Sequence, residues 1–320
     1  MQEMIVSRLK ELFSAGEITR VVGWKAGESF YDVSPAVFES ADELKDFVYN
    51  EFCGANLSKF LVKLGNKEGK SAVVLKPCDS FSLNQLIKDH RLKRENLYLL
   101  AVPCKGKVSE EALRDSGIAG MLQCTAEGDQ LVIETLYGTE RRARAEMLHV
   151  KCRTCHAQAH AVMDEMLGEY PEKTVGDRFA GVVDVENMSE DERYEFWRGE
   201  LSRCIRCNAC RNACPACNCE KCVFDNSESG IAAKSNANSF EENMFHIIRA
   251  FHVTGRCTDC GECSRVCPQN IPLHLLNRKM IKDMNTYYGE YQAGADTDSE
   301  HPLVDFKEND VEPSIVKEGN

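Results

Sequence analysis

The chain has 320 residues, 43% of them hydrophobic, and a formal net charge of -12 from 51 acidic and 39 basic residues. This length is typical of about two domains with a real core, and the acidic balance argues against binding to a nucleic-acid backbone, which needs a basic face. No segment approaches the roughly 20 apolar residues that span a bilayer, and the N-terminus lacks the apolar core of a signal peptide. We therefore expect a cytoplasmic chain without a membrane span.

The first 146 residues combine helical and strand patterns. Residues 71–75 and 97–102 are short apolar runs of the kind that form buried strands, and residues 82–90 between them follow a helical period. A strand–helix–strand unit of this kind builds a parallel sheet. A hairpin is predicted around Gly128, which separates two further strand patterns. We therefore predict an α/β domain over residues 1–146.

Residues 147–200 have the character of a linker. They begin with a C-x2-C pair, Cys152 and Cys155. They end at a predicted helix whose start is marked by a capping box of Ser189 and Glu192.

Residues 201–288 contain two runs of the pattern C-x2-C-x2-C-x3-C-P, which is the spacing of bacterial ferredoxins. Three cysteines of such a run hold one [4Fe-4S] cluster, and the fourth ligates the other cluster. We assign the first cluster to Cys204, Cys207, Cys210 and Cys267. We assign the second cluster to Cys257, Cys260, Cys263 and Cys214. Helical patterns on both sides of the runs predict a mainly α-helical dicluster ferredoxin domain, followed by an acidic tail at residues 289–320.

Two other uses of so many cysteines fit the sequence less well. A disulfide framework is typical of short secreted chains, whereas this chain is long and has an odd number of cysteines, 17. Structural zinc sites use pairs of C-x2-C and not triplets closed by C-x3-C-P. The two runs therefore predict electron transfer through iron–sulfur clusters.

Two further C-x2-C pairs remain after the runs are assigned, Cys152 with Cys155 and Cys219 with Cys222. Together they could hold a third [4Fe-4S] cluster or a zinc ion, because thiolate ligands alone do not separate these metals. The position of Cys219 and Cys222 directly after a cluster loop favours iron–sulfur. Cys217 is an alternative to Cys219 as the ligand.

Residues 70–285 resemble the beta-subunit family of deazaflavin-reducing hydrogenases and dehydrogenases. The resemblance rests on the segments AVVLKPCDSFSLNQLIKDHRLKRENLYLLAVPCKG and KCRTCHAQAHAVMDEMLGE. The segment CIRCNACRNACPACNCEKC is also similar to the A subunit of anaerobic sulfite reductase. FHVTGRCTDCGECSRVCPQNIPLHLLNRKM is similar to dicluster proteins associated with heterodisulfide reductase.

The resemblance implies that the α/β domain is either an FAD site or a scaffold for assembly. A flavin would approach the loops at the strand ends, where the residues concerned are Lys76, Pro77, Cys78 and Lys105. The two lysines would offer positive charge to a pyrophosphate. The sequence contains no glycine-rich dinucleotide fingerprint, so flavin binding depends on the resemblance and on this loop.

The function that we expect is that of an electron-transfer subunit in a larger anaerobic oxidoreductase complex. Its [4Fe-4S] clusters would relay electrons between a flavin or partner subunit and a redox enzyme, with catalysis shared among the subunits. The alternative is that this chain is itself the catalytic flavoprotein, which oxidises or reduces a diffusible carrier. Hydrogen, formate, sulfite and heterodisulfide chemistry all remain open for the partner.

Overall fold

A five-stranded sheet forms the first part of the computed structural model, which describes residues 1–64, 67–172, 176–226 and 239–303. The strand order is β2-β1-β3-β4-β8, and only the β1–β2 pair is antiparallel. The strands are β1 (Arg20–Ala26), β2 (Val33–Phe38), β3 (Ser71–Leu75), β4 (Leu97–Ala101) and β8 (Glu165–Met166). The predicted strand–helix–strand unit is therefore present, with β3 and β4 parallel and adjacent.

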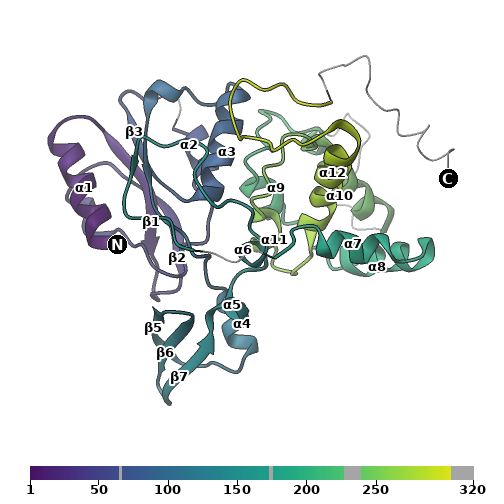
Figure 1. The fold of residues 1–320 in the computed structure, drawn as a ribbon, viewed down its shortest axis with the longest axis horizontal. Helices are drawn as coiled ribbons and strands as arrows, with labels where there is room; N and C mark the ends of the chain where they lie inside the picture. The colour runs from purple at the N-terminus through teal and green to yellow at the C-terminus, as the bar shows by residue number, and fades with distance from the viewer. Residues whose placement is uncertain (65–66, 173–175, 227–238, 304–320) are drawn as a thin grey trace.

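Helices cover both faces of this sheet (Figure 1). Helix α1 (Gln2–Ser14) packs on one face through Ile5, Leu9 and Leu12, all of which are fully buried. Helix α3 (Pro77–Lys88) lies on the side that faces the C-terminal helices (Figure 1). All five residues of β3 are buried, as expected for a strand that is covered on both faces.

Short elements complete the connections of this part. They are η1 (Glu43–Asp46), α2 (Ser58–Val62) and η2 (Arg94–Asn96).

A second, three-stranded antiparallel sheet projects from the first part (Figure 1). It consists of β5 (Met121–Glu127), β6 (Gln130–Thr135) and β7 (Gly138–Ala143). The predicted hairpin is confirmed, because Glu127 pairs with Gln130 across the turn at Gly128. Leu131 and Ile133 of β6 pack against Leu113 of α4 (Glu110–Asp115) in a small separate core.

The C-terminal part is mainly helical, so the predicted fold class is confirmed. Its helices and turns are α7 (Ala180–Glu186), α8 (Glu190–Ser202), α9 (Ala209–Ala213), η3 (Val223–Asp225), α10 (Ser239–His252), α11 (Glu262–Arg265) and α12 (Leu273–Tyr288). The predicted capping box starts α8: the Ser189 hydroxyl accepts from the Glu192 N–H, and the Glu192 carboxylate accepts from the Ser189 N–H. Helix α8 packs against α10, and α12 packs against both α10 and α7.

Residues 147–200 do more than connect two domains. They contain α6 (Val150–Arg153), which follows α5 (Arg144–Met147), and they supply β8 to the large sheet. β8 has only two residues, and the Glu165 carboxylate in it accepts hydrogen bonds from Arg8 of α1 and Tyr98 of β4. The edge of the sheet is thus completed by a segment whose sequence pattern is that of a linker.

The described part of the predicted tail folds back onto the chain. Gly294 has a φ of +74°, and a Cβ there would stand 1.9 Å from the Phe81 carbonyl oxygen of α3. Residues 304–320 of the predicted tail lie outside the described residues. Among the helices that the structure describes, none is long and apolar enough to cross a membrane.

Candidate metal centres

The two cysteine loops share one backbone shape. In the first loop Arg206 and Asn208 have φ values of 55° and 61°. In the second loop Asp259 and Gly261 stand at the equivalent positions, with φ values of 56° and 66°. Positive φ is uncommon for residues other than glycine, and alternating left- and right-handed residues turn successive N–H groups into an anion-binding concavity. Both loops are therefore shaped to surround an anionic group, which fits an iron–sulfur cluster with its thiolate ligands.

The first predicted set of cysteines lines one cavity. This set is Cys204, Cys207, Cys210 and Cys267. Phe245, Ile271 and Leu273 form apolar walls of the same cavity, and the Arg206 N–H donates to Cys204 Sγ at 3.4 Å. His246 Nε2 lies 3.3 Å from the same sulfur. The second loop thus contributes its last cysteine to the first set, as the crossed assignment requires, while ligation itself stays a prediction.

The second predicted set also gathers around a cysteine from the other loop. Burial raises the pKa of the Cys257, Cys260 and Cys263 thiols, and the nearby Cys214 sulfur raises the pKa of all three further. The Asn277 amide donates to Cys263 Sγ at 3.6 Å. The Cys214 sulfur therefore lies close enough to all three cysteines of the second loop to influence their ionisation, as a shared centre would require.

A third group of cysteines meets at the carboxyl edge of the large sheet. Cys78 follows β3 in the chain, Cys104 follows β4, and Cys152 and Cys155 come with α6. Burial raises the pKa of the Cys152 thiol, and Cys104 and Cys155 raise it further. Burial likewise raises the pKa of Cys78, with contributions from Asp79 and then Cys155. The Lys107 N–H donates to Cys152 Sγ at 3.4 Å.

This arrangement differs from the predicted third site. Cys152 and Cys155 lie with Cys78 and Cys104, because α6 packs beside the loops that follow two neighbouring parallel strands. Cys219 and Cys222 line a different cavity together with Cys217. The described contacts therefore do not bring Cys152 and Cys155 together with Cys219 and Cys222, and the ligands of a third site stay a prediction. The signal that could have indicated the group at the sheet edge was the position of Cys78 and Cys104 after adjacent strands, since such strands end at one edge of the sheet.

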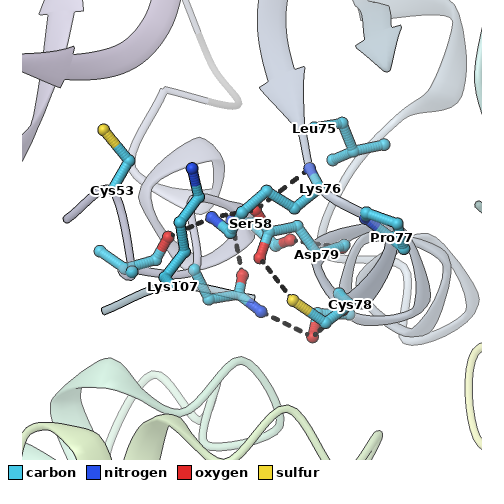
Figure 2. Close-up of polar contacts among 12 residues, drawn as sticks. Cys53, Ser58, Leu75, Lys76, Pro77, Cys78, Asp79 and Lys107 are labelled. Atoms are coloured by element: carbon cyan, nitrogen blue, oxygen red, sulfur yellow. Dashed lines mark hydrogen bonds and ion pairs between the residues drawn. The ribbon is translucent and has the colours of Figure 1, made fainter. Parts of the chain in front are cut away.

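Of the residues predicted for a flavin, Lys76 already has partners inside the domain. Lys76 is only 1% exposed, and its ammonium lies 2.9 Å from the Asp79 carboxylate (Figure 2). It also donates to the Ala55 carbonyl oxygen at 2.8 Å. The same ammonium stands 4.2 Å from the centre of the Trp24 ring. It therefore has buried partners inside the domain and cannot also reach a pyrophosphate in this arrangement.

The two residues that follow Lys76 lie in the first turn of α3. Pro77 begins α3, and Cys78 Sγ lies 3.6 Å from the Asp79 carboxylate (Figure 2). Of the predicted flavin residues only Lys105 is exposed. This loop closes a turn between a strand and a helix and directs Cys78 toward the other cysteines.

A buried charge network joins the third group to the second. Lys151 precedes Cys152, and its ammonium pairs with the Glu262 carboxylate and donates to the Gly54 carbonyl oxygen at 2.8 Å. Glu262, which precedes Cys263, is 2% exposed and also binds Arg265 through two contacts of 2.9 Å. Burial alone would raise the pKa of Glu262, but Lys151 and Arg265 hold it well below the usual value. Helices α6 and α11 are thereby fixed together with a cysteine on each.

Arg249 of α10 lies between the first and second sets. Its side chain is 2% exposed, and Cys263, Cys210, Cys214 and Cys217 surround it and raise its pKa against the effect of burial. Among the described residues no carboxylate contacts its guanidinium nitrogens. A buried guanidinium of this kind destabilises the fold unless anions neutralise it, and the sulfur atoms of two clusters would do so.

Comparisons with known proteins agree with this chemistry. Residues 200–271 match the 4Fe-4S dicluster domain family. The chain is 24% identical to the F420-dependent formate dehydrogenase subunit beta of Methanocaldococcus jannaschii, over 88% of this chain and 89% of that protein. It is 22% identical to the F420-dependent formate dehydrogenase 1 subunit beta of Methanococcus maripaludis, over 69% of this chain and 73% of that protein.

A solved structure of the F420-reducing [NiFe] hydrogenase complex from Methanosarcina barkeri contains a similar chain. The TM-score is 0.39 at 9% identity, and the match covers 47% of this chain and 58% of that chain. The expected resemblance to hydrogenase and dehydrogenase beta subunits is confirmed by the sequence relatives, and residues 200–271 match the 4Fe-4S dicluster domain family.

Proposed function

We propose that this chain is an iron–sulfur electron-transfer subunit of a multi-subunit oxidoreductase. The observation that carries the proposal is the pair of matched cysteine loops, each of which meets the last cysteine of the other. Bound [4Fe-4S] clusters take up and release single electrons, with potentials that depend on charge, hydrogen bonds to sulfur and exposure. The chain's own part is to hold such clusters close together and to exclude water from them.

The third cluster of the proposal uses Cys78, Cys104, Cys152 and Cys155 as its ligands. Two loops that follow neighbouring strands and one C-x2-C pair supply these sulfur atoms. Zinc is the alternative occupant. The contact between α6 and α11 favours iron–sulfur, because it brings this group next to the second cysteine set, where a redox centre could exchange electrons and zinc could not.

The relay that we propose runs from the third group through the second set to the first. The first set lies nearest the surface: Cys207 is exposed, and the neighbouring Ile205 side chain is 60% exposed. An exposed apolar residue beside an exposed cluster ligand is a suitable contact for a protein that receives or supplies electrons. We infer that a partner subunit docks at this end.

Support for a partner subunit also comes from the relatives, which are named as beta subunits of formate dehydrogenases. We propose that this chain acts beside a catalytic subunit of that class. Isolation of the tagged chain from its own cells without oxygen should recover such a subunit in equal amount. A chain that is recovered alone, with its full iron content, would contradict the proposal of a complex.

The iron content tests the electron-transfer function itself. Protein purified without oxygen should contain about twelve iron atoms and equal sulfide for three clusters, or about eight if the third site holds zinc. Iron near four per chain, or iron without sulfide, would refute the assignment. Flavin released on unfolding would favour the alternative of a catalytic flavoprotein, and its absence would favour an electron-transfer subunit.

A further inference from the structure

Two buried polar side chains of the helical part each contact a sulfur atom of one ferredoxin-type set. His246 of α10 is 1% exposed, and its Nε2 lies 3.3 Å from Cys204 Sγ of the first set. Asn277 of α12 is 4% exposed, and its amide donates to Cys263 Sγ of the second set at 3.6 Å. Each set thus has a side-chain contact of its own, and the two contacts come from different helices.

The other polar atom of each side chain is left without a partner. His246 Nδ1 and Asn277 Oδ1 are buried and have no hydrogen-bond partner among the described residues. A buried polar atom without a partner destabilises a protein, and an apolar side chain of similar shape would not have this cost. Fold stability therefore does not account for a polar residue at either position, whereas a contact with a cluster ligand does.

The chemistry of a cluster ligand fixes the orientation of both side chains. A cysteine sulfur bound to iron as a thiolate can accept a hydrogen bond but has no hydrogen to donate. The contact with Cys204 Sγ therefore requires a hydrogen on His246 Nε2, which leaves Nδ1 as the atom without a partner. The Asn277 amide likewise directs its nitrogen toward sulfur and its oxygen away from it. Both side chains thus present an N–H donor to a predicted ligand.

An N–H donor at a ligand sulfur acts on the reduction potential of the cluster. Hydrogen bonds to sulfur are among the factors that set this potential. The reduced form carries one more negative charge than the oxidised form, so the donor stabilises it more and raises the potential. Each donor acts mainly on the cluster whose ligand it contacts. Arg249 differs in this respect, because it lies beside cysteines of both sets.

We propose that His246 and Asn277 are positioning residues that set the reduction potentials of the two clusters separately. His246 acts on the first cluster through Cys204. Asn277 acts on the second cluster through Cys263. These roles rest on the proposed function, since the clusters must be bound for the donors to act. The difference in potential between two successive steps of the relay would then depend on residues outside the cysteine loops.

The test measures the midpoint potential of each cluster in His246→Leu and Asn277→Leu, by potentiometric titration followed by EPR. His246→Leu should make reduction of the first cluster about tenfold less favourable, which lowers its midpoint potential by about 59 mV. The potential of the second cluster should not change. Asn277→Leu should lower the potential of the second cluster and leave the first unchanged, so each variant is the matched control of the other.

The variant His246→Gln separates the hydrogen bond from the packing of the ring. Its side-chain amide keeps an N–H donor, so the potential of the first cluster should lie closer to that of the parent than to that of His246→Leu. Three results would overturn the proposal: no shift of the first cluster in His246→Leu, an equal shift of both clusters, or a Gln variant that matches the Leu variant.

A second measurement uses the unmutated chain, in case His246→Leu loses its cluster. Pulsed EPR of the reduced protein with ¹⁵N-labelled histidine should show a coupling to a histidine nitrogen in the signal that Cys204→Ser removes. His246→Gln should lose this coupling and keep the signal. A first-cluster signal without histidine coupling in the parent would contradict the role of His246. Failure of the electron-transfer function would look different, because the parent would then show no signals of reduced clusters.

Discussion

Single residues set the charge around the sulfur atoms, and Arg249 has the most central position among them. It is buried, it lies beside cysteines of both ferredoxin-type sets, and no carboxylate among the described residues contacts its guanidinium. A positive charge beside a cluster favours the added electron by direct Coulomb attraction. Arg249 is therefore expected to raise the reduction potentials of both centres.

Replacement of this residue gives the first prediction. Arg249→Gln should lower the midpoint potentials of both clusters by on the order of 60 mV, which is a tenfold change for a one-electron couple. Arg249→Lys keeps the charge and should lower them less. Potentiometric titration followed by EPR measures both values. Equal potentials in the parent and the Gln variant would show that the guanidinium does not act on the clusters.

The buried pair of Lys151 and Glu262 gives the second prediction. Glu262→Gln should reduce the free energy of unfolding by about 3–5 kcal/mol, because it leaves the Lys151 ammonium buried without an anion. Lys151→Met should reduce the free energy of unfolding by a smaller amount, since Glu262 keeps Arg265 as its partner. Denaturant titration measures both. The control Glu195→Gln removes a carboxylate from an exposed ion pair of α8 and should have little effect.

At the scale of elements, the apolar and capping patterns of the sequence predict individual strands and helices, but they do not predict how these elements contact one another. β3 and β4 were predictable because their residues are almost all buried and therefore apolar, and α8 was predictable from its capping box. The β1–β2 hairpin has no such clear pattern. β2 is half-exposed and contains Pro35, which is tolerated because β2 is an edge strand.

Other elements depend on contacts that the sequence does not record. β8 has two residues, and its pairing with β4 is set by tertiary packing. Lys76 resembles a surface cation in the sequence, although Asp79 three residues later was a sign of its buried partner. Ferredoxin spacing predicts the crossed cysteine sets, and ligation within them stays a prediction. The group at the sheet edge was indicated only in part, because Cys78 and Cys104 follow adjacent strands but nothing in the sequence places α6 beside them.

The contact between α6 and α11 gives the third prediction. Gly261 has a φ of +66°, and a Cβ there would lie 2.4 Å from Lys151 Cβ. Gly261→Ala should therefore push α6 away from α11 and reduce the iron bound by the second set. The matched control is Asn208→Gly at the equivalent position of the first loop, which relaxes the same backbone conformation and should keep all iron. Iron retention after gel filtration without oxygen measures the difference, and equal retention in the two variants would contradict the role of this contact.

At the scale of the whole molecule, the α/β part and the helical part are held together around the proposed relay. Arg256, in the loop after α10, binds Asp89 at the end of α3, and the hydroxyls of Ser82 and Thr258 are 2.9 Å apart. Lys151 and Glu262 join the two parts at a second point. The third cysteine group and the second set therefore cannot move apart without breaking buried polar contacts. This rigidity suits electron transfer, which depends on fixed short distances between centres.

The central claim is that two clusters share the two cysteine loops by crossed ligation. The most direct test is the EPR spectrum of the reduced protein in three single variants, Cys214→Ser, Cys257→Ser and Cys204→Ser. The spectrum of Cys214→Ser should match that of Cys257→Ser, because both residues would serve the second cluster although they belong to different loops. A spectrum of Cys214→Ser that matched Cys204→Ser instead would contradict the crossed arrangement.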